Sequence, residues 1–303
     1  MSKVPEKLDE QQTDIANGDF GSENEALRRH LSPRQVQFFA IGGSIGTALF
    51  ISIGFGLLHG GAGSLLLAFI IQGIMMTFVT NAIAEMTIFM PVSAAFIQHG
   101  GAWVDQAWGF MLGWNFFVFE AFLPAFEITA VDLVLTFWRD DIPSAAVITV
   151  CIATYGLTNA FGVKYFAFRS VYVRFVLFFI LGAICVGIVL SARDPTLVKV
   201  LGSGETGTSA SSVYVIAMRN MGVDALPHAV NALLLTSIYS AGDCYMFTAI
   251  RSLYALAQGG HAPKILLKTT KNGVPIYCFA VSIGFSCLAY LKLSSSTVTV
   301  LNW

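Results

Sequence analysis

The sequence predicts an all-α integral membrane protein. Of its 303 residues, 55% are hydrophobic and only 12% are charged, whereas ordinary globular proteins carry about 25% charged residues. The apolar residues are gathered in long runs, and a helix needs about 20 mostly apolar residues to cross a bilayer. The net charge of −1 and the absence of a basic patch in the sequence do not indicate a nucleic-acid partner. We therefore expect a bundle of helices whose main partner is the lipid bilayer.

Seven apolar segments are candidate membrane spans, and a C-terminal stub at 297–303 begins an eighth. The seven are about 36–58, 64–90, 110–138, 143–161, 171–190, 226–257 and 274–291. Residues 1–30 are polar and lack the basic start and apolar core of a signal peptide, so we expect a disordered cytoplasmic tail before a transmembrane domain at 31–303. The connection 192–225 is rich in Gly, Ser and Thr and is predicted to be an external loop.

The basic residues predict the orientation of the chain. With the N-terminus in the cytoplasm, 12 of the 17 Lys and Arg residues fall on the inner face, as the excess of positive charge in cytoplasmic loops requires. The five cysteines lie in apolar runs with no CxxC spacing, so we expect them to be buried rather than to form disulfides or a metal site.

A glycine-rich stretch interrupts the first apolar segment. Three glycines and two hydroxyl residues within six positions make a poor continuous helix, because an interior glycine costs about 1 kcal/mol relative to alanine. One interpretation is an unwound span whose free backbone N–H groups bind an anionic substrate group. The other is close helix packing through a GxxxG spacing. The residues concerned are Gly42, Gly43, Ser44, Ile45, Gly46 and Thr47.

The second and third segments carry acidic residues, which are expensive in a membrane and therefore functional candidates. Glu120 and Glu127 are seven residues apart, which places them two turns apart on one helix face. They could line a polar cavity or be hydrogen-bonded acceptors within the packing. Glu85, near the inner end of its segment, is either functional or an interfacial acid, and Asp132 is expected to be solvated near the outer interface.

The sixth segment carries hydroxyl groups, a glycine and an acid at mid-span. Ser237, Ser240 and Asp243 fit a substrate or ion pathway, although hydroxyl bonds to helix carbonyls would also explain the serines. Gly109 and Gly113 form another GxxxG spacing, for which helix packing is the simplest explanation. The sequence shows no hydrolytic triad, phosphate loop or metal-ligand cluster, so an enzyme is not expected.

Four sequence blocks resemble the fungal amino-acid permeases of the amino acid–polyamine–organocation superfamily. The first is 41–50 (IGGSIGTALF), and the second is 85–86 (EM) with 89–92 (FMPV). The third is 113–115 (GWN) with Pro124 and Glu127. The last comprises 226–227 (LP), Asn231, 240–242 (SAG), 252–257 (SLYALA), 262–264 (APK) and 273–275 (GVP).

The resemblance implies a leucine-transporter-type bundle of twelve spans, in which two inverted repeats enclose a midplane substrate site. It implies that the glycine-rich break binds the α-carboxylate of an amino acid and that a proton is the usual coupling ion, with no other cofactor. The candidate substrate-binding residues are the stretch 42–47 with Glu127, Ser237 and Ser240, and the candidate coupling residues are Glu85, Glu120, Glu127 and Asp243.

The chain also departs from the family pattern. After Phe166, the segment from Ala167 onward resembles the lead-in to the family's seventh span, so two spans and a loop, roughly 90–100 residues, are missing. The last three spans of the family are absent as well, and Asp243 stands where the family has Asn.

We expect a plasma-membrane amino-acid permease with an incomplete bundle of about seven spans. The alternative is a non-transporting fragment, such as a splice or gene-model product or a sensor or partner remnant. The resemblance identifies neither the amino acid nor an oligomeric state.

Overall fold

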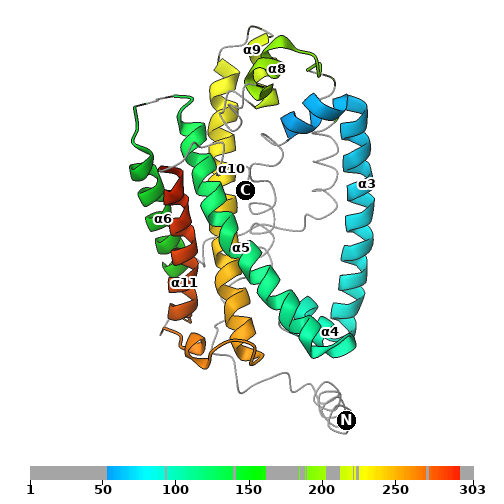
Figure 1. Cartoon of the computed structure of the whole chain (residues 1–303), viewed down its shortest axis with the longest axis vertical. Helices are drawn as coiled ribbons and strands as arrows, with labels where there is room; N and C mark the ends of the chain where they lie inside the picture. The colour runs from blue at the N-terminus through cyan, green and yellow to red at the C-terminus, as the bar shows by residue number, and fades with distance from the viewer. Residues whose placement is uncertain are drawn as a thin grey trace.

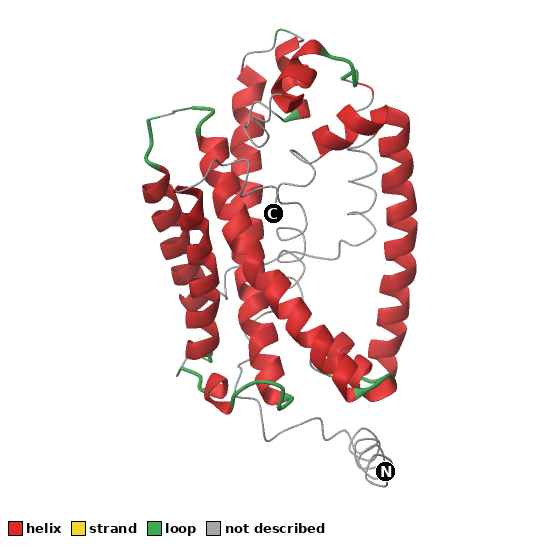
Figure 2. Cartoon of the chain, viewed as in Figure 1, coloured by secondary structure: helices red, strands yellow, loops and turns green. Residues whose placement is uncertain are grey.

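The computed structural model is helical throughout the part of the chain that it describes, which comprises residues 53–92, 94–138, 141–161, 184, 188, 190–202, 212–220, 222, 225–270 and 273–293. No strand occurs in these ranges (Figure 2). Within them, an isolated β-bridge joins Thr269 to Pro275. The α-helices are α3 (Ile53–Phe89), α4 (Ala95–Trp103), α5 (Gln106–Leu135), α6 (Ser144–Phe161), α8 (Pro195–Gly202), α9 (Val213–Asn220), α10 (Ala225–Gln258) and α11 (Ile276–Ser286). Two 3₁₀ segments, η3 (Lys264–Leu267) and η4 (Cys287–Leu293), flank α11.

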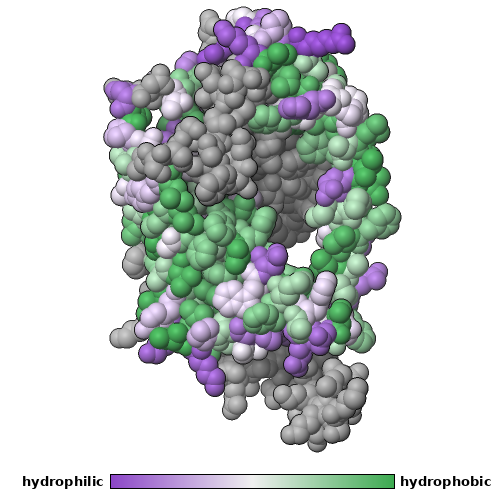
Figure 3. All heavy atoms as spheres, in the orientation of Figure 1, coloured by the Kyte–Doolittle hydropathy of each residue, from purple (hydrophilic) through white to green (hydrophobic). Residues whose placement is uncertain are grey.

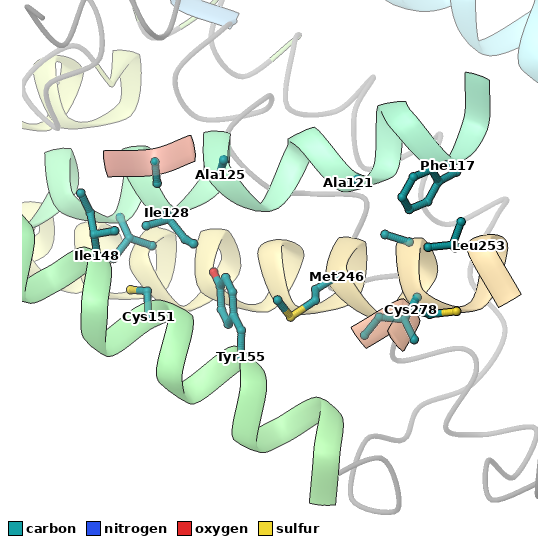
Figure 4. Packing of buried hydrophobic residues seen from close by; sticks show 14 of the residues in the cluster. Phe117, Ala121, Ala125, Ile128, Ile148, Cys151, Tyr155, Met246, Leu253 and Cys278 are labelled. Carbon is teal, nitrogen blue, oxygen red and sulfur yellow. The ribbon is translucent and has the colours of Figure 1, made fainter. Parts of the chain in front are cut away.

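A bundle of α5, α6, α10 and α11 forms the centre of the fold (Figure 1). The two longest helices of the bundle, α5 and α10, pack against each other extensively, and α6 and α11 cover one side of the pair. Their buried apolar side chains form one continuous core, in which Tyr155 of α6 points toward α5 and α10 (Figure 4). This core positions every buried acidic residue described below.

The long helix α3 stands apart from the bundle on the opposite side of the molecule (Figure 1). It packs against α4 and α8, and most of its large apolar side chains are exposed, including Leu67, Ile71 and Phe78. Gly61 interrupts the helix with a φ of 72° and a ψ of 170°, a backbone conformation that glycine adopts without the steric penalty of a Cβ. The interruption lies between the first and second predicted spans.

The surface has the polarity of a membrane protein. On the face shown in Figure 3, hydrophobic residues cover the middle of the molecule and hydrophilic residues gather near its two ends. Within the described ranges, α3 and residues 227–258 of α10 are long and apolar enough to cross a bilayer. The helices around 144–160 and 276–291 are apolar but shorter. The prediction of seven spans thus stays a prediction.

The connection 192–225 is more structured than the loop predicted from its composition. It contains α8 and α9, whose buried residues Leu197, Val213 and Ile216 pack with Ile53 and Leu57 of α3 in a second apolar cluster. Asp194 joins the two short helices, because its Oδ1 accepts hydrogen bonds from the backbone N–H groups of residues 196 and 197 at 2.9 and 3.1 Å, and its Oδ2 accepts one from Asn220 at 2.8 Å. Because the segment is rich in Gly, Ser and Thr, the sequence did not indicate that these few positions would be buried.

The cysteine prediction is correct for three residues and wrong for one. Cys151, Cys244 and Cys278 are buried and free, whereas Cys287, the first residue of η4, is free and exposed. Cys185 lies outside the described residues.

Candidate functional site

The described part of the candidate site lies between α5, α6 and α10. The glycine-rich stretch, with Gly42, Gly43, Ser44, Ile45, Gly46 and Thr47, lies outside the described residues, as does the junction between Phe166 and Ala167. The predicted unwound span is therefore not tested by the structure, and the geometry below concerns the acidic and hydroxyl residues of the bundle.

Glu120 and Glu127 are both buried on α5, with 8% and 3% of their surface exposed. Both carboxyl groups lie near enough to Tyr245 of α10 to interact with it electrostatically. Among the described residues, none forms a hydrogen bond to the Oε2 atom of Glu120. The sequence thus placed two acids together on a buried helix face, and one of them has an unused acceptor atom.

Asp132 is buried, with 4% of its surface exposed, so the prediction of a solvated outer residue is wrong. It lies one turn beyond Ile128, and every α5 residue from Glu127 to Val134 is buried. Because Val131 and Val134 at this end of α5 share a buried apolar cluster with residues of α6 and α10, its proximity to the predicted helix end did not expose it.

Glu85 lies apart from these acids. It is exposed on α3, whose main contacts are with α4 and α8 rather than with the central bundle. This position agrees with an interfacial acid, which was one of the two interpretations, and the structure does not bring it together with Glu120, Glu127 or Asp243.

Asp243 accepts two hydrogen bonds from the neighbouring helix α6. It is 3% exposed on α10, and its Oδ1 accepts hydrogen bonds from Thr158 Oγ1 at 2.5 Å and Asn159 Nδ2 at 2.8 Å, both from α6. Ser240 and Ser237, about one and two turns earlier on α10, are half-buried. The nearby Thr236 donates to the backbone carbonyl of Leu233 at 2.8 Å. This is the kind of hydroxyl-to-carbonyl bond that was the alternative explanation for the hydroxyl residues of this segment.

Sequence reasoning missed the α6 side of this site. Tyr155, Thr158 and Asn159 all lie against α10, and Tyr155 is fully buried with its ring centroid 4.9 Å from that of Tyr239. Gly242 allows this approach, because a Cβ at that position would collide with the Tyr155 hydroxyl. The available signal was the Thr158-Asn159 pair at the end of an otherwise apolar segment.

A cavity of about 520 Å³ lies beside the site, toward the start of α6 and α10. Its lining is apolar except for a few groups that include the hydroxyls of Thr154, Thr236 and Tyr239, and it contains neither Glu120 nor Glu127. A charged amino acid would find no ionic partner there. Asp243 does not line this cavity either.

The sequence profile of the amino acid permease family matches residues 35–172 and 166–303 of the chain. The chain belongs to this family. The two matches meet at residues 166–172, where the sequence predicted an internal deletion. The family is one of transporters, and neither its profile nor the described helices indicate catalytic chemistry.

Several curated fungal permeases are similar to this family member. General amino acid permease AGP2 of Saccharomyces cerevisiae is 30% identical over 91% of this chain and 63% of its own length. The probable proline-specific permease put4 of Schizosaccharomyces pombe is 28% identical, with coverages of 86% and 65%. Lysine/arginine permease CAN1 of Candida albicans is 27% identical, with coverages of 95% and 65%. The chain thus spans less than two thirds of these relatives, and no solved structure matches it.

The lengths of these alignments are consistent with the predicted internal deletion. The alignment with AGP2 extends over 375 positions, although 91% of this permease chain amounts to only about 276 residues. About 100 positions of the alignment therefore have no residue of this chain, in agreement with the roughly 90–100 residues that the sequence predicts to be missing.

Proposed function

We propose that this chain is a multi-pass permease of the plasma membrane that transports an amino acid, driven by a proton gradient. The observation that carries the proposal is the family match, which extends from residue 35 to residue 303. The proposed architecture is an incomplete leucine-transporter-type bundle of about seven spans with a cytoplasmic N-terminus.

In this proposal the glycine-rich break provides backbone N–H groups for the substrate carboxylate, because such groups at a half-helix N-terminus favour anions. Glu127, Ser237 and Ser240 contribute from the described helices. Glu85, Glu120, Glu127 and Asp243 are the candidates for carrying the coupling proton, and the burial of the last three supports a role inside the membrane.

Uptake measurements test the proposal. Cells that express the chain and lack their own amino-acid permeases should take up at least one labelled amino acid, and Gly43→Leu or Gly46→Leu should abolish uptake by blocking the backbone approach. Gly63→Leu is the matched control, because a Cβ at Gly63 meets no atom within 4 Å. If no amino acid enters above the empty-vector level, the 303-residue form is a non-transporting permease.

Sequencing the genomic DNA and transcript across Phe166–Ala167 shows whether the gene encodes the missing spans. An exon of about 100 codons at that junction would mean that the transporting protein contains the missing spans. A transcript that is continuous as written, together with absent uptake, would favour a sensor or partner remnant instead.

A further inference from the structure

A buried carboxylate connects α6 to α10. Thr158 and Asn159 of α6 both donate to the same oxygen of Asp243, Oδ1, although they are 85 and 84 residues away in the sequence. Tyr155 packs one turn earlier against Gly242 and Tyr239. The two helices therefore meet through one polar contact next to a tightly packed aromatic contact.

No cation in the described part of the chain forms an ion pair with this carboxylate. The titratable groups near enough to interact with it electrostatically are Tyr155 of α6 and Tyr239 of α10, and Tyr155 also interacts with Glu127 of α5. An ionised carboxylate without a positive partner is expensive inside a membrane and is sustained only by strong donors or by a pathway for protons.

The donors around Asp243 can serve both of its protonation states. Asn159 Nδ2 uses its two hydrogens on Asp243 and on the carbonyl of Tyr155, the latter at 3.0 Å. Thr158 Oγ1 has one hydrogen but three acceptors within reach, which are Asp243 Oδ1 and the carbonyls of Thr154 and Tyr155, both at 3.0 Å. Its hydrogen therefore has an alternative to the carboxylate.

We propose that Asp243 is a proton-binding site and that its protonated carboxyl group donates a hydrogen bond to Thr158 Oγ1. In the ionised state, Thr158 donates to Oδ1. When a proton from solvent binds Oδ1, the new O–H group donates to Thr158 Oγ1, and the Thr158 hydroxyl turns to donate to the carbonyl of Thr154 or Tyr155. Every donor keeps an acceptor in both states, so Asp243 changes charge without separating α6 from α10.

The inference deepens the proposed function, since it rests on placing α6 and α10 in the bilayer and identifies how one coupling candidate holds its proton. Its test does not require transport. The full chain in lipid nanodiscs is titrated from acidic to alkaline buffer while infrared difference spectra follow the C=O stretch of protonated carboxyl groups.

Asp243→Asn keeps an acceptor for Thr158 and Asn159 but cannot ionise, so one carboxyl component should disappear from the titration. Glu85→Gln, at an exposed site, should leave that component in place. Thr158→Val should shift its frequency, because the carboxyl O–H group loses its acceptor, and Thr158→Ser should restore the frequency.

Two results would overturn the proposal. One is a titration in which Asp243→Asn and the wild-type chain give the same spectra. The other is a carboxyl signal that responds to added sodium at constant pH instead of to pH, which would make Asp243 a ligand of a metal cation. Either result would leave amino-acid uptake to be judged by the uptake assay alone.

Discussion

The hydroxyl group of Tyr155 is buried between three helices, and none of the described residues forms a hydrogen bond with it. A buried hydroxyl without a partner costs about 1–3 kcal/mol. We therefore expect Tyr155→Phe to raise the free energy of unfolding in detergent by about 1 kcal/mol or more, measured by denaturant titration.

Tyr290→Phe is the matched control for this substitution. The Tyr290 hydroxyl is 2.7 Å from Thr149 Oγ1, so removing it should lower the free energy of unfolding by about 1 kcal/mol. Equal losses in the two variants would show that Tyr155 is bonded in the folded protein.

Gly242 determines how closely Tyr155 approaches α10. A Cβ there would lie 2.8 Å from Cζ and 2.9 Å from Cε2 of the Tyr155 ring, closer than folded proteins tolerate. Gly242→Ala should therefore lower the free energy of unfolding by about 1–3 kcal/mol, as overpacked cores do. Denaturant titration measures this loss. Gly284→Ala, where a Cβ meets open space, should be neutral or slightly stabilising in the same titration because alanine favours a helix.

The sequence identified the important acidic residues but not the side chains that bond to them or cover them. Asp243, Glu120 and Glu127 stood out because acids are rare in apolar segments. The bonds from Thr158 and Asn159 to Asp243 join positions more than 80 residues apart, and no local periodicity carries that information. Asp132 was misjudged for the same reason, since its burial depends on which helices pack against the end of α5.

The contact between α4 and α5 depends on two glycines. A Cβ at Gly109 of α5 would lie 2.9 Å from both Cα and N of Gly101 in α4, and backbone atoms cannot move aside as a side chain can. Gly109→Ala should therefore separate α4 from α5 and lower the melting temperature in detergent. Gly63→Ala, in an open position on α3, should not. Equal melting temperatures would mean that α4 does not pack closely on α5.

Composition predicted the long helices but not the short ones. Apolar runs predicted helices at α5, α6 and α10, because length and hydropathy suffice for that. They did not predict α4, α8 or α9, which have only 8 or 9 residues each. Such short helices are marginal alone and depend on tertiary packing, as the contact of Leu197 and Ile216 with the end of α3 illustrates.

For the whole molecule, thiol accessibility reports whether the described bundle forms. In a Cys185→Ser background, which removes the one cysteine outside the described residues, an apolar maleimide should label Cys287 alone in native detergent micelles. Denaturation should expose Cys151, Cys244 and Cys278 as well. Mass spectrometry would count the labels, and native labelling of Cys151 or Cys278 would contradict the packing of α6 and α11 in the bundle.

The separation of α5 and α10 in the sequence has a consequence for biogenesis. Ala225 begins α10 90 residues after Leu135 ends α5, which at ordinary synthesis rates is a delay of about 5–20 s. During that interval Glu120, Glu127 and Asp132 have been translated, while the helix that covers their side of α5 has not. An acid at the centre of an inserting helix costs about 3 kcal/mol, so α5 depends on the insertion machinery until α10 arrives.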